Sequence, residues 1–346
     1  MELTPREIDV LNIIVESYIQ NASPVGSRFV AKRSSLNLSP ASMRNIMADL
    51  TEKGYLAQPH TSAGRVPTDM GFRYYVDTLL QPDIPPEKLQ ATIREYLSQA
   101  GLELSGILEK TSKLISDQSS LVGMAVAPQS GSVRWKHIDF VRVSSGLVMA
   151  VLVFEGGMVQ HKLLEVQERV GQEDLEKYRN ILNEQFQGMP LYEVKERILS
   201  QMELARSEFN KLYERALNLA KEACGEDEQE RQVYVDGTVK VWDRLDSKDL
   251  ESMRELLEFL EHRSDLMDIL DQITRNQGQG LTVIFGSQIT GRNLSEWSII
   301  SSPYGIHDRT LGVVGTIGPV HMDYSRLVPL VDYIAKMLNQ ILESRA

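Results

Sequence analysis

The sequence predicts a multidomain α+β protein, because three of its features point away from a single compact core. Its 346 residues exceed the length that one hydrophobic core usually serves. The first 80 residues carry helical patterns, whereas residues 121–166 are typical of strands. Strand patterns return after residue 280, beyond a charged helical stretch at about 172–225. Strands, then mostly helices, then strands again predict one α/β domain that is split by an insertion.

The composition is that of a soluble globular protein, with 42% apolar and 25% charged residues. The longest strongly apolar run, Leu147–Phe154, is too short to span a bilayer, and the N-terminus lacks the apolar core of a signal peptide. Cys224 is the only cysteine, so an intrachain disulfide is impossible and a thiolate metal site is not expected. We therefore expect a cytoplasmic protein with no membrane partner.

Three helix signatures open the chain. Thr4 and Glu7 form a capping box in front of the first helix, "PREIDVLNIIVESYIQ". Ser27 is the expected cap of a short second helix, "RFVAKR". Ser39 caps the third helix, "PASMRNIMADLTEK", and Gly54 ends it. The apolar side of this third helix consists of Met43, Ile46, Met47 and Leu50.

A hairpin and a closing helix are expected next. "YLAQ" (55–58) and "RVPT" (65–68) can pair as two short strands around a tip at 59–64, where Gly64 would supply a positive φ. "DMGFRYYVDTLL" (69–80) supplies the closing helix. Three helices followed by a hairpin are typical of a winged helix-turn-helix, in which the hairpin is the wing.

The charge distribution favours a local contact with nucleic acid. The whole chain carries a net charge of −11, which taken alone argues against such a partner. Residues 26–75, however, hold seven basic and only three acidic residues. The basic window therefore coincides with the predicted winged helix.

The side of the third helix opposite its apolar stripe holds small and polar residues: Ala41, Asn45 and Ala48, flanked by Ser42 and Arg44. Alanine lets a helix approach another surface closely. Arginine can bind both acceptors of a guanine edge, and asparagine both groups of an adenine edge. In a helix-turn-helix, the N-terminal half of the recognition helix touches the bases, which is where these residues lie. An ordinary solvent-exposed helix is the alternative.

The wing supplies a second group of candidates. Thr61 and Ser62 offer hydroxyl donors, and Arg65 can follow a phosphate backbone or enter a minor groove. His60 is equally consistent with a DNA contact and with a structural hydrogen bond. The alternative for the whole hairpin is an ordinary surface hairpin whose arginine contacts no partner. The complete set of candidate DNA-binding residues is Ser39, Ala41, Ser42, Arg44, Asn45, His60, Thr61, Ser62 and Arg65.

Four motifs closely resemble the HrcA family of heat-inducible transcription repressors. They are "SPVGSRFVAKR", "SPASMRNIMADL", "QPHTSAGRVPTDMGFRYYVD" and "SSPYGIHDRTLGVVGTIGPVHMDYSRLVPLVDYIAKML". The resemblance implies an N-terminal winged helix, a GAF-like domain and an inserted dimerising domain. It also implies a homodimer that binds an inverted-repeat operator, called CIRCE, before chaperone operons, with the GroEL chaperonin keeping the repressor active. Many members have an acidic residue where this chain has Ile46, to which we assign a packing role.

The proline-rich stretch "QPDIPPEK" marks the first domain boundary. With the domain names that the resemblance implies, we expect a winged-helix DNA-binding domain at 1–80 and a linker with a connector helix at 81–120. The GAF-like domain should comprise 121–170 plus 246–346, and the inserted dimerising domain 171–245.

No motif indicates a catalytic, metal or cofactor site. "LGVVGTIGP" lacks the spacing of a phosphate-binding loop, and the six histidines show no metal-binding spacing. "HMDYSR" (321–326) fits a loop and a helix cap, since no nucleophile elbow surrounds its serine. We therefore expect a protein that is not an enzyme, has no cofactor and has no evident small-molecule ligand. The alternatives are a ligand-sensing regulator and, more remotely, a hydrolase with an appended DNA-binding module.

Overall fold

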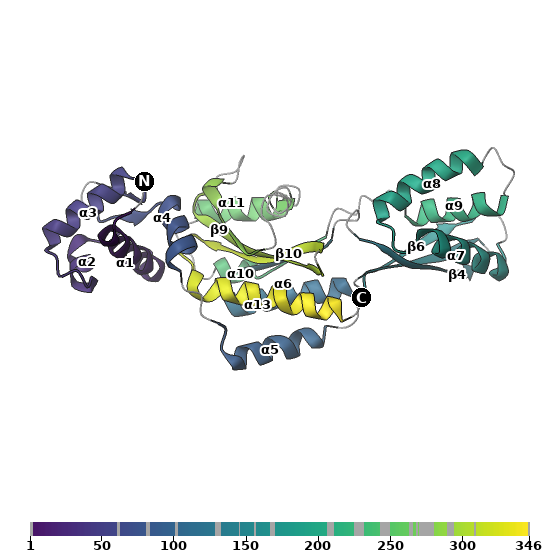
Figure 1. Ribbon diagram of the computed structural model, residues 1–346, viewed down its shortest axis with the longest axis horizontal. Helices are drawn as coiled ribbons and strands as arrows, with labels where there is room; N and C mark the ends of the chain where they lie inside the picture. The colour runs from purple at the N-terminus through teal and green to yellow at the C-terminus, as the bar shows by residue number, and fades with distance from the viewer. Residues whose placement is uncertain are drawn as a thin grey trace.

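The chain forms three bodies that lie in a row (Figure 1). The computed structural model describes residues 3–60, 63–80, 84–100, 103–128, 133–144, 146–155, 157–166, 170–205, 211–224, 232–242, 250–262, 266–267, 269, 280–288, 294–307 and 309–344. A helical body (3–80) forms one end, a central body (103–128 with 232–344) lies in the middle, and an outer body (133–224) forms the other end. The predicted mixture of helices and several sheets is confirmed.

The helical body contains three helices, a two-stranded hairpin and a closing helix. Its elements are α1 (Pro5–Asn21), α2 (Ser27–Arg33), α3 (Pro40–Glu52), β1 (Leu56–Ala57), β2 (Val66–Pro67), α4 (Asp69–Tyr74) and a π-helical turn, η1 (Tyr75–Leu79). The predicted capping box in front of α1 is present. α1 packs against α2, α3 and α4, and Leu11, Ile14 and Met47 are among the buried side chains that hold these helices together.

Two local predictions for this body are wrong, and one backbone pairing explains both. Val25 pairs with Arg65, which keeps Gly26 extended, so Gly26 and not Ser27 precedes the first turn of α2. Gly64 does not have a positive φ. A β-carbon at Gly64 would lie 2.3 Å from the carbonyl oxygen of Val25, so glycine is needed there for the close approach of two backbones.

The central body is built on a five-stranded antiparallel sheet. Its elements are α6 (Leu104–Ser119), β3 (Val122–Val126), β7 (Val233–Asp236), α10 (Thr238–Trp242), α11 (Leu250–Glu261), β8 (Thr282–Phe285), a 3-10 turn η3 (Gly286–Gln288), β9 (Trp297–Ile306), β10 (Arg309–Pro319) and α13 (Tyr324–Glu343). The strand order is β7-β3-β10-β9-β8. Figure 1 shows α6 and α13 on one side of the sheet and α11 on the other. Coverage on both faces explains why β3 is buried at every position.

The remaining helix of this region, α5 (Glu87–Ser98), packs on α6 and α13. Its apolar stripe supplies Ile93 and Leu97, which are both buried. The expected linker of 81–120 therefore differs from the structure, because α6 is a packed layer of the central body. An amphipathic pattern shows that a helix buries one face, but it does not show which part of the protein that face packs against.

The outer body has its own sheet and its own core. Its elements are β4 (Trp135–Ser144), β5 (Leu147–Phe154), β6 (Val159–Glu165), α7 (Gln172–Phe186), α8 (Leu191–Ala205) and α9 (Lys211–Ala223). Helices α7 and α9 pack against β4 and β6, and Trp135, Phe154 and Phe186 are buried between the layers. The amide of Asn183 accepts from the backbone N–H of Ile138 (2.7 Å) and donates to its carbonyl (2.9 Å), which ties α7 to β4.

The expected boundary between residues 170 and 171 also differs from the structure. Strands β4, β5 and β6 form a separate sheet with α7, α8 and α9, so the inserted unit already begins near residue 133. β7 returns to the central sheet, where Val126 lies opposite Val233. A strand pattern does not specify which sheet the strand joins.

None of the described helices is long and apolar enough to cross a membrane.

Candidate nucleic-acid interface

Helix α3 presents one polar side to solvent because its other side is in the core. Met43, Met47 and Leu50 are buried, and Ile46 packs partly buried against the same core, in agreement with the packing role that we expected. Arg44 and Asn45 are exposed on the opposite side. Within the described part of the chain, neither side chain has a hydrogen-bond or ion-pair partner, so both are free to reach another surface.

Ser39 caps the N-terminus of α3, which is exposed. The Ser39 hydroxyl accepts from the backbone N–H of Ser42 at 3.1 Å and lies 3.1 Å from the Ser42 hydroxyl. Pro40 follows as the first helical residue and Ala41 is exposed. The first turn of the helix therefore offers two small hydroxyl side chains and an alanine at its open end, where partial positive charge favours anions.

The hairpin lies against α1 and α3, and it pairs with the segment that precedes α2. Backbone hydrogen bonds join Val25 and Arg65 in both directions, at 2.8 and 2.9 Å. The Arg65 Nε–H donates to the Thr51 hydroxyl at 3.0 Å, which fixes one edge of the guanidinium beside the end of α3. Arg65 is therefore half-buried beside α3, and its remaining N–H donors extend from a fixed base.

Hydrogen bonds join the described residues on either side of the hairpin tip. The carbonyl of His60 accepts from the backbone N–H of Ala63 at 2.9 Å, and the Gln58 side chain donates to the Ala63 carbonyl at 3.2 Å. The side chain of His60 is exposed. Thr61 and Ser62 lie outside the described residues.

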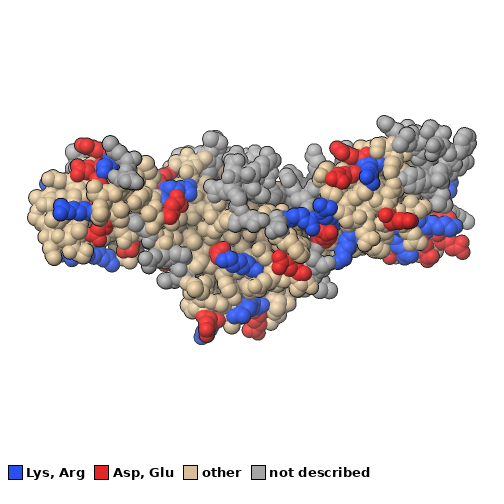
Figure 2. Space-filling view, viewed as in Figure 1, with Lys and Arg blue, Asp and Glu red and all other residues tan. Residues whose placement is uncertain are grey.

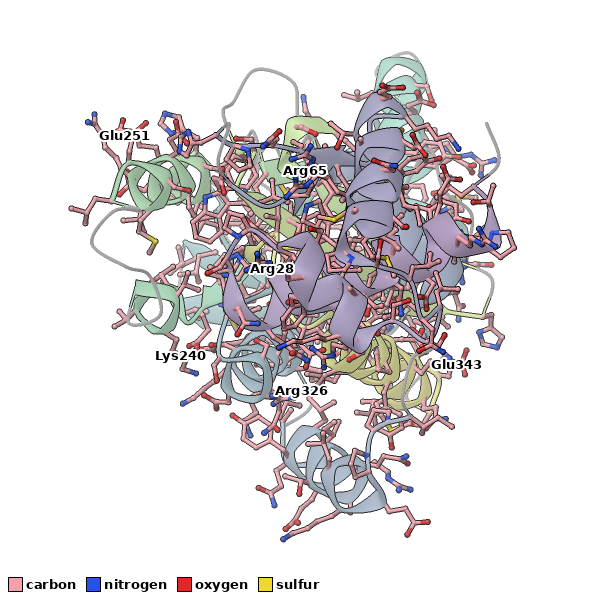
Figure 3. All side chains as sticks on the ribbon, turned by 90° about the vertical axis from the view of Figure 1, so that its left-hand side faces the viewer. Arg28, Arg65, Lys240, Glu251, Arg326 and Glu343 are labelled. Carbon is pink, nitrogen blue, oxygen red and sulfur yellow. The ribbon has the colours of Figure 1, made fainter. Side chains whose placement is uncertain are left out.

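Sequence reasoning missed Arg28 as a candidate. Arg28 is exposed near the start of α2, three residues after Val25, which pairs with Arg65. Figure 3 looks onto the end of the molecule formed by the helical body and labels Arg28 and Arg65 there. Figure 2 shows a different face, on which basic and acidic described side chains are mixed over all three bodies. The surplus of basic residues in 26–75 could have indicated Arg28. The Val25–Arg65 pairing is what brings the start of α2 to the hairpin.

An ion pair fixes the far end of α3. Lys53 Nζ lies 2.7 and 2.9 Å from the two carboxylate oxygens of Glu7, which also accepts from the backbone N–H and the hydroxyl of Thr4. Burial of this carboxylate acts to raise its pKa, but the hydrogen bonds from Lys53 and Thr4 outweigh burial and keep the pKa of Glu7 below its ordinary value of 4.5.

We expect Glu7→Gln to lower the free energy of unfolding of the helical body by about 2 kcal/mol at pH 7. Because the folded-state pKa is depressed, the stabilisation is complete above the unfolded value of 4.5 and is lost as the pH falls through the folded-state pKa. Denaturant titrations of both proteins at pH 7 and at pH 3 measure this. Glu52→Gln, on an exposed position of α3, is the control and should change little. An equal difference at both pH values would contradict the assignment.

The C-terminal two thirds of the chain places it among known proteins. Residues 105–328 match the family model described as "HrcA protein C terminal domain". The chain belongs to the HrcA family. The resemblance that its motifs carry is thereby confirmed, and it extends over nearly the whole chain in the individual relatives.

Two relatives show the range of similarity. A "Heat-inducible transcription repressor HrcA" from Nitratidesulfovibrio vulgaris (strain DSM 19637 / Miyazaki F) is 42% identical, over 99% of this chain and 97% of that protein. The protein of the same description from Brevibacillus brevis is 32% identical, over 99% of both chains. A crystal structure of a hypothetical protein has the same fold, with a TM-score of 0.61 at 24% sequence identity over 100% of both chains.

The C-terminal HrcA motif forms structural contacts. Within "HMDYSR", Asp323 caps α13 by accepting from the backbone N–H of Arg326 at 3.3 Å and from the Ser325 hydroxyl at 2.6 Å, which confirms the expected helix cap.

Burial raises the pKa of Cys224 to about 12, so its thiol is protonated at neutral pH. No group of three or more potential metal ligands occurs among the residues that the structure describes.

Proposed function

We propose that this chain is a sequence-specific DNA-binding repressor of heat-shock (chaperone) operons. The observation that carries the proposal is the exposed side of α3, where Arg44 and Asn45 project from a helix anchored by Met43 and Met47. The relatives named as heat-inducible transcription repressors support the class of function. In this proposal the helical body is a winged helix-turn-helix, α3 is its recognition helix and the β1–β2 hairpin is its wing.

The candidate residues divide into three groups by position. Arg44 and Asn45 would read base edges in the major groove, and Ala41 would allow the close approach. Ser39 and Ser42, at the open N-terminus of α3, would contact a phosphate.

The wing would add contacts beside the recognition helix. Arg65 would lie along the backbone or in a minor groove, with His60, Thr61 and Ser62 at the tip of the hairpin. Arg28, which is exposed near the wing, would add a phosphate contact.

We further propose that the chain acts as a homodimer through the outer body. The side of the β4-β5-β6 sheet opposite its helices carries apolar residues that no described element covers. Val141 of β4 lies opposite Met149 of β5, which lies opposite Leu163 of β6. Four residues further along β5, Val153 lies opposite Val159. Leu163 is 57% exposed. Such a face is a liability on a monomer, and a symmetric partner would cover it.

The other two bodies take the roles that the family resemblance implies. The central body would be the GAF-like domain and the outer body, 133–224, the inserted dimerising domain. A two-fold symmetric dimer reads two half-sites of opposite direction, which fits an inverted-repeat operator of the CIRCE type. The split central core supports a need for the GroEL chaperonin, since β3 pairs with β10 across the whole insertion, with Val122 opposite Ile317.

Selection from random duplexes tests the function directly. The full chain should enrich an inverted repeat, and a footprint on that duplex should protect both half-sites. Enrichment of no sequence, or binding that is the same on selected and scrambled duplexes, would refute sequence-specific recognition. Repeating the measurement with cell metabolites distinguishes a ligand-sensing regulator, whose DNA affinity would change.

Chaperonin and ATP are expected to increase the fraction of molecules that bind the operator. Folding must bring together strands that are far apart in the chain, so part of the protein should become trapped without assistance. Stoichiometric titration of operator measures the active fraction, and the dissociation constant of the active molecules should stay constant. A bovine serum albumin control excludes a crowding effect. An active fraction that does not respond to any chaperonin concentration would remove this part of the proposal.

A further inference from the structure

Backbone contacts hold helix α4 to the rest of the helical body. The Thr68 backbone N–H donates to the Tyr55 carbonyl at 3.0 Å, and the Thr68 hydroxyl donates to the Gly54 carbonyl at 2.6 Å. A β-carbon at Gly71 would lie 2.3 Å from the same Tyr55 carbonyl oxygen. The backbone of α4 therefore packs directly on the segment that leads into the hairpin, with no side chain between them.

The other side of α4 is fixed to the central sheet by Arg73. Its Nη1 donates to the carbonyl of Val283 and its Nη2 to the Oε1 of Gln288, both at 2.6 Å. The guanidinium carbon also lies 5.1 Å from the ring centre of Phe285. Val283 and Phe285 belong to β8, an edge strand of the central sheet. The Oε1 of Gln288 accepts from the Phe285 backbone N–H at 3.2 Å, so this acceptor is itself held in place.

An aromatic cluster completes the joint. Phe72, which is buried, stands next to Arg73 on α4. Its ring centre lies 6.0 Å from Tyr18 of α1, 6.0 Å from Phe285 of β8 and 6.2 Å from Tyr324 of α13. Phe72 thus contacts both bodies at once. The cluster provides the apolar contact area. The directional contacts across the joint come from Arg73 and from the Ser287 hydroxyl, which donates to the Asp69 carboxylate of α4.

The angle matters to a dimer that reads two half-sites. The two recognition helices must reach major grooves about 34–36 Å apart, or a multiple of that spacing. Once one recognition helix has bound its half-site, the other must be held in the correct direction to reach the second half-site. A loosely attached helical body lowers the effective concentration of the second helix at that half-site. Lysine cannot replace the arginine, because a single ammonium group does not span two separate acceptors in one plane.

We propose that Arg73 is a positioning residue for DNA recognition: by joining α4 to β8 and Gln288, it sets the direction in which the helical body presents α3. The inference rests on the proposed function. It assigns a role in DNA binding to a residue that lies at the joint between the bodies and outside the candidate interface.

Half-site and whole-site duplexes test the proposal. The inverted repeat selected by the unmodified chain is compared with a single half-site and with repeats whose spacer is changed by one, two or five base pairs. Arg73→Ala should bind the whole site about tenfold more weakly, bind the half-site as the unmodified chain does, and discriminate less between spacers. Arg73→Lys should behave like Arg73→Ala. Equal losses on half-site and whole site, or an unchanged spacer profile, would overturn the proposal.

Two further variants keep the result interpretable. Gln288→Ala removes one acceptor without altering the helical body, and it should show the same pattern in a weaker form. Arg94→Ala removes a charge from α5 and should match the unmodified chain. Among the residues that the structure describes, the Arg94 side chain bonds only to the Gln90 carbonyl of its own helix. A spacer profile that is as flat for Arg94→Ala as for Arg73→Ala would count against a specific role for Arg73.

A measurement without DNA separates this inference from the proposed function. Nitroxide labels at Arg28→Cys and Lys336→Cys, diluted with unlabelled protein, report the distance between the two bodies within one chain. The distribution should be narrow in the parent protein and broad in Arg73→Ala. A narrow distribution in Arg73→Ala would overturn the inference alone. A parent protein that selects no repeat in the DNA experiment would overturn the proposed function, and the positioning role with it.

Discussion

Replacing Val141 and Leu163 together by aspartate is expected to convert the proposed dimer into monomers and to lower operator affinity by about 100-fold or more. Both side chains are exposed and flank Met149 in one row of the outer sheet. Two carboxylates in the centre of an apolar contact would be desolvated without a partner, and the symmetry of the dimer would double the number of such charges. Sedimentation measures the mass, and operator titration measures the affinity.

The same double variant should keep its fold, because neither residue is part of the core between the sheet and its helices. Leu199→Asp on α8 is the matched control: Leu199 is 52% exposed, on the helical side of the outer body, and its replacement should leave the dimer intact. Half-site affinity should be close to that of the parent in both variants. A double variant that sediments as the parent dimer would show that the contact lies elsewhere.

The parts of the fold that local chemistry determines were predictable. The capping box of Thr4 and Glu7 and the Ser39 cap of α3 act within one turn of the residues that carry them. The apolar stripe of α3 likewise predicts which side faces the core, and with it the exposure of Arg44 and Asn45. The reading side of the candidate interface therefore follows from helical phase alone.

Features that depend on contacts between distant segments were not predictable. Arg65 was expected in the hairpin, but the sequence did not indicate that its backbone pairs with Val25 or that its side chain bonds to Thr51. The same pairing sets the start of α2 and requires glycine at position 64. No pattern within the hairpin contains this information, because its cause lies almost forty residues earlier in the chain.

The strands of the two sheets differ in how they are buried. β5 alternates between buried and half-buried positions, as expected for a sheet that helices cover on one face. β9 and β10 are buried almost continuously, as expected for strands covered on both faces. Small residues such as Ser301 and Gly315 occupy many positions in these two strands and conceal the continuous pattern in a count of large apolar residues. The pairing of Val122 with Ile317 nevertheless joins strands that are far apart in the chain, so a local pattern does not predict it.

Arg44→Ala is expected to cost about 1–3 kcal/mol at the operator and to relax the preference at one base position. Arg44 is exposed, has no partner among the described residues and projects from the N-terminal half of α3. Its loss should therefore leave the fold unchanged and affect only the selected sequence. Binding to scrambled duplex should fall much less than binding to the operator.

The contrast with Arg65 makes the Arg44 result decisive. Arg65→Ala should weaken operator and scrambled duplex by similar factors, and should reduce the salt dependence by about one unit of slope if the side chain contacts a phosphate. Thr51→Val keeps the charge of Arg65 but removes the hydroxyl that orients it, so its effect should be smaller than that of Arg65→Ala and equally independent of sequence. Isotherms at several salt concentrations on both duplexes measure all three variants. Equal losses on both duplexes for Arg44→Ala and Arg65→Ala would refute the division between a reading helix and a positioning wing, because base-edge contacts alone distinguish the two duplexes.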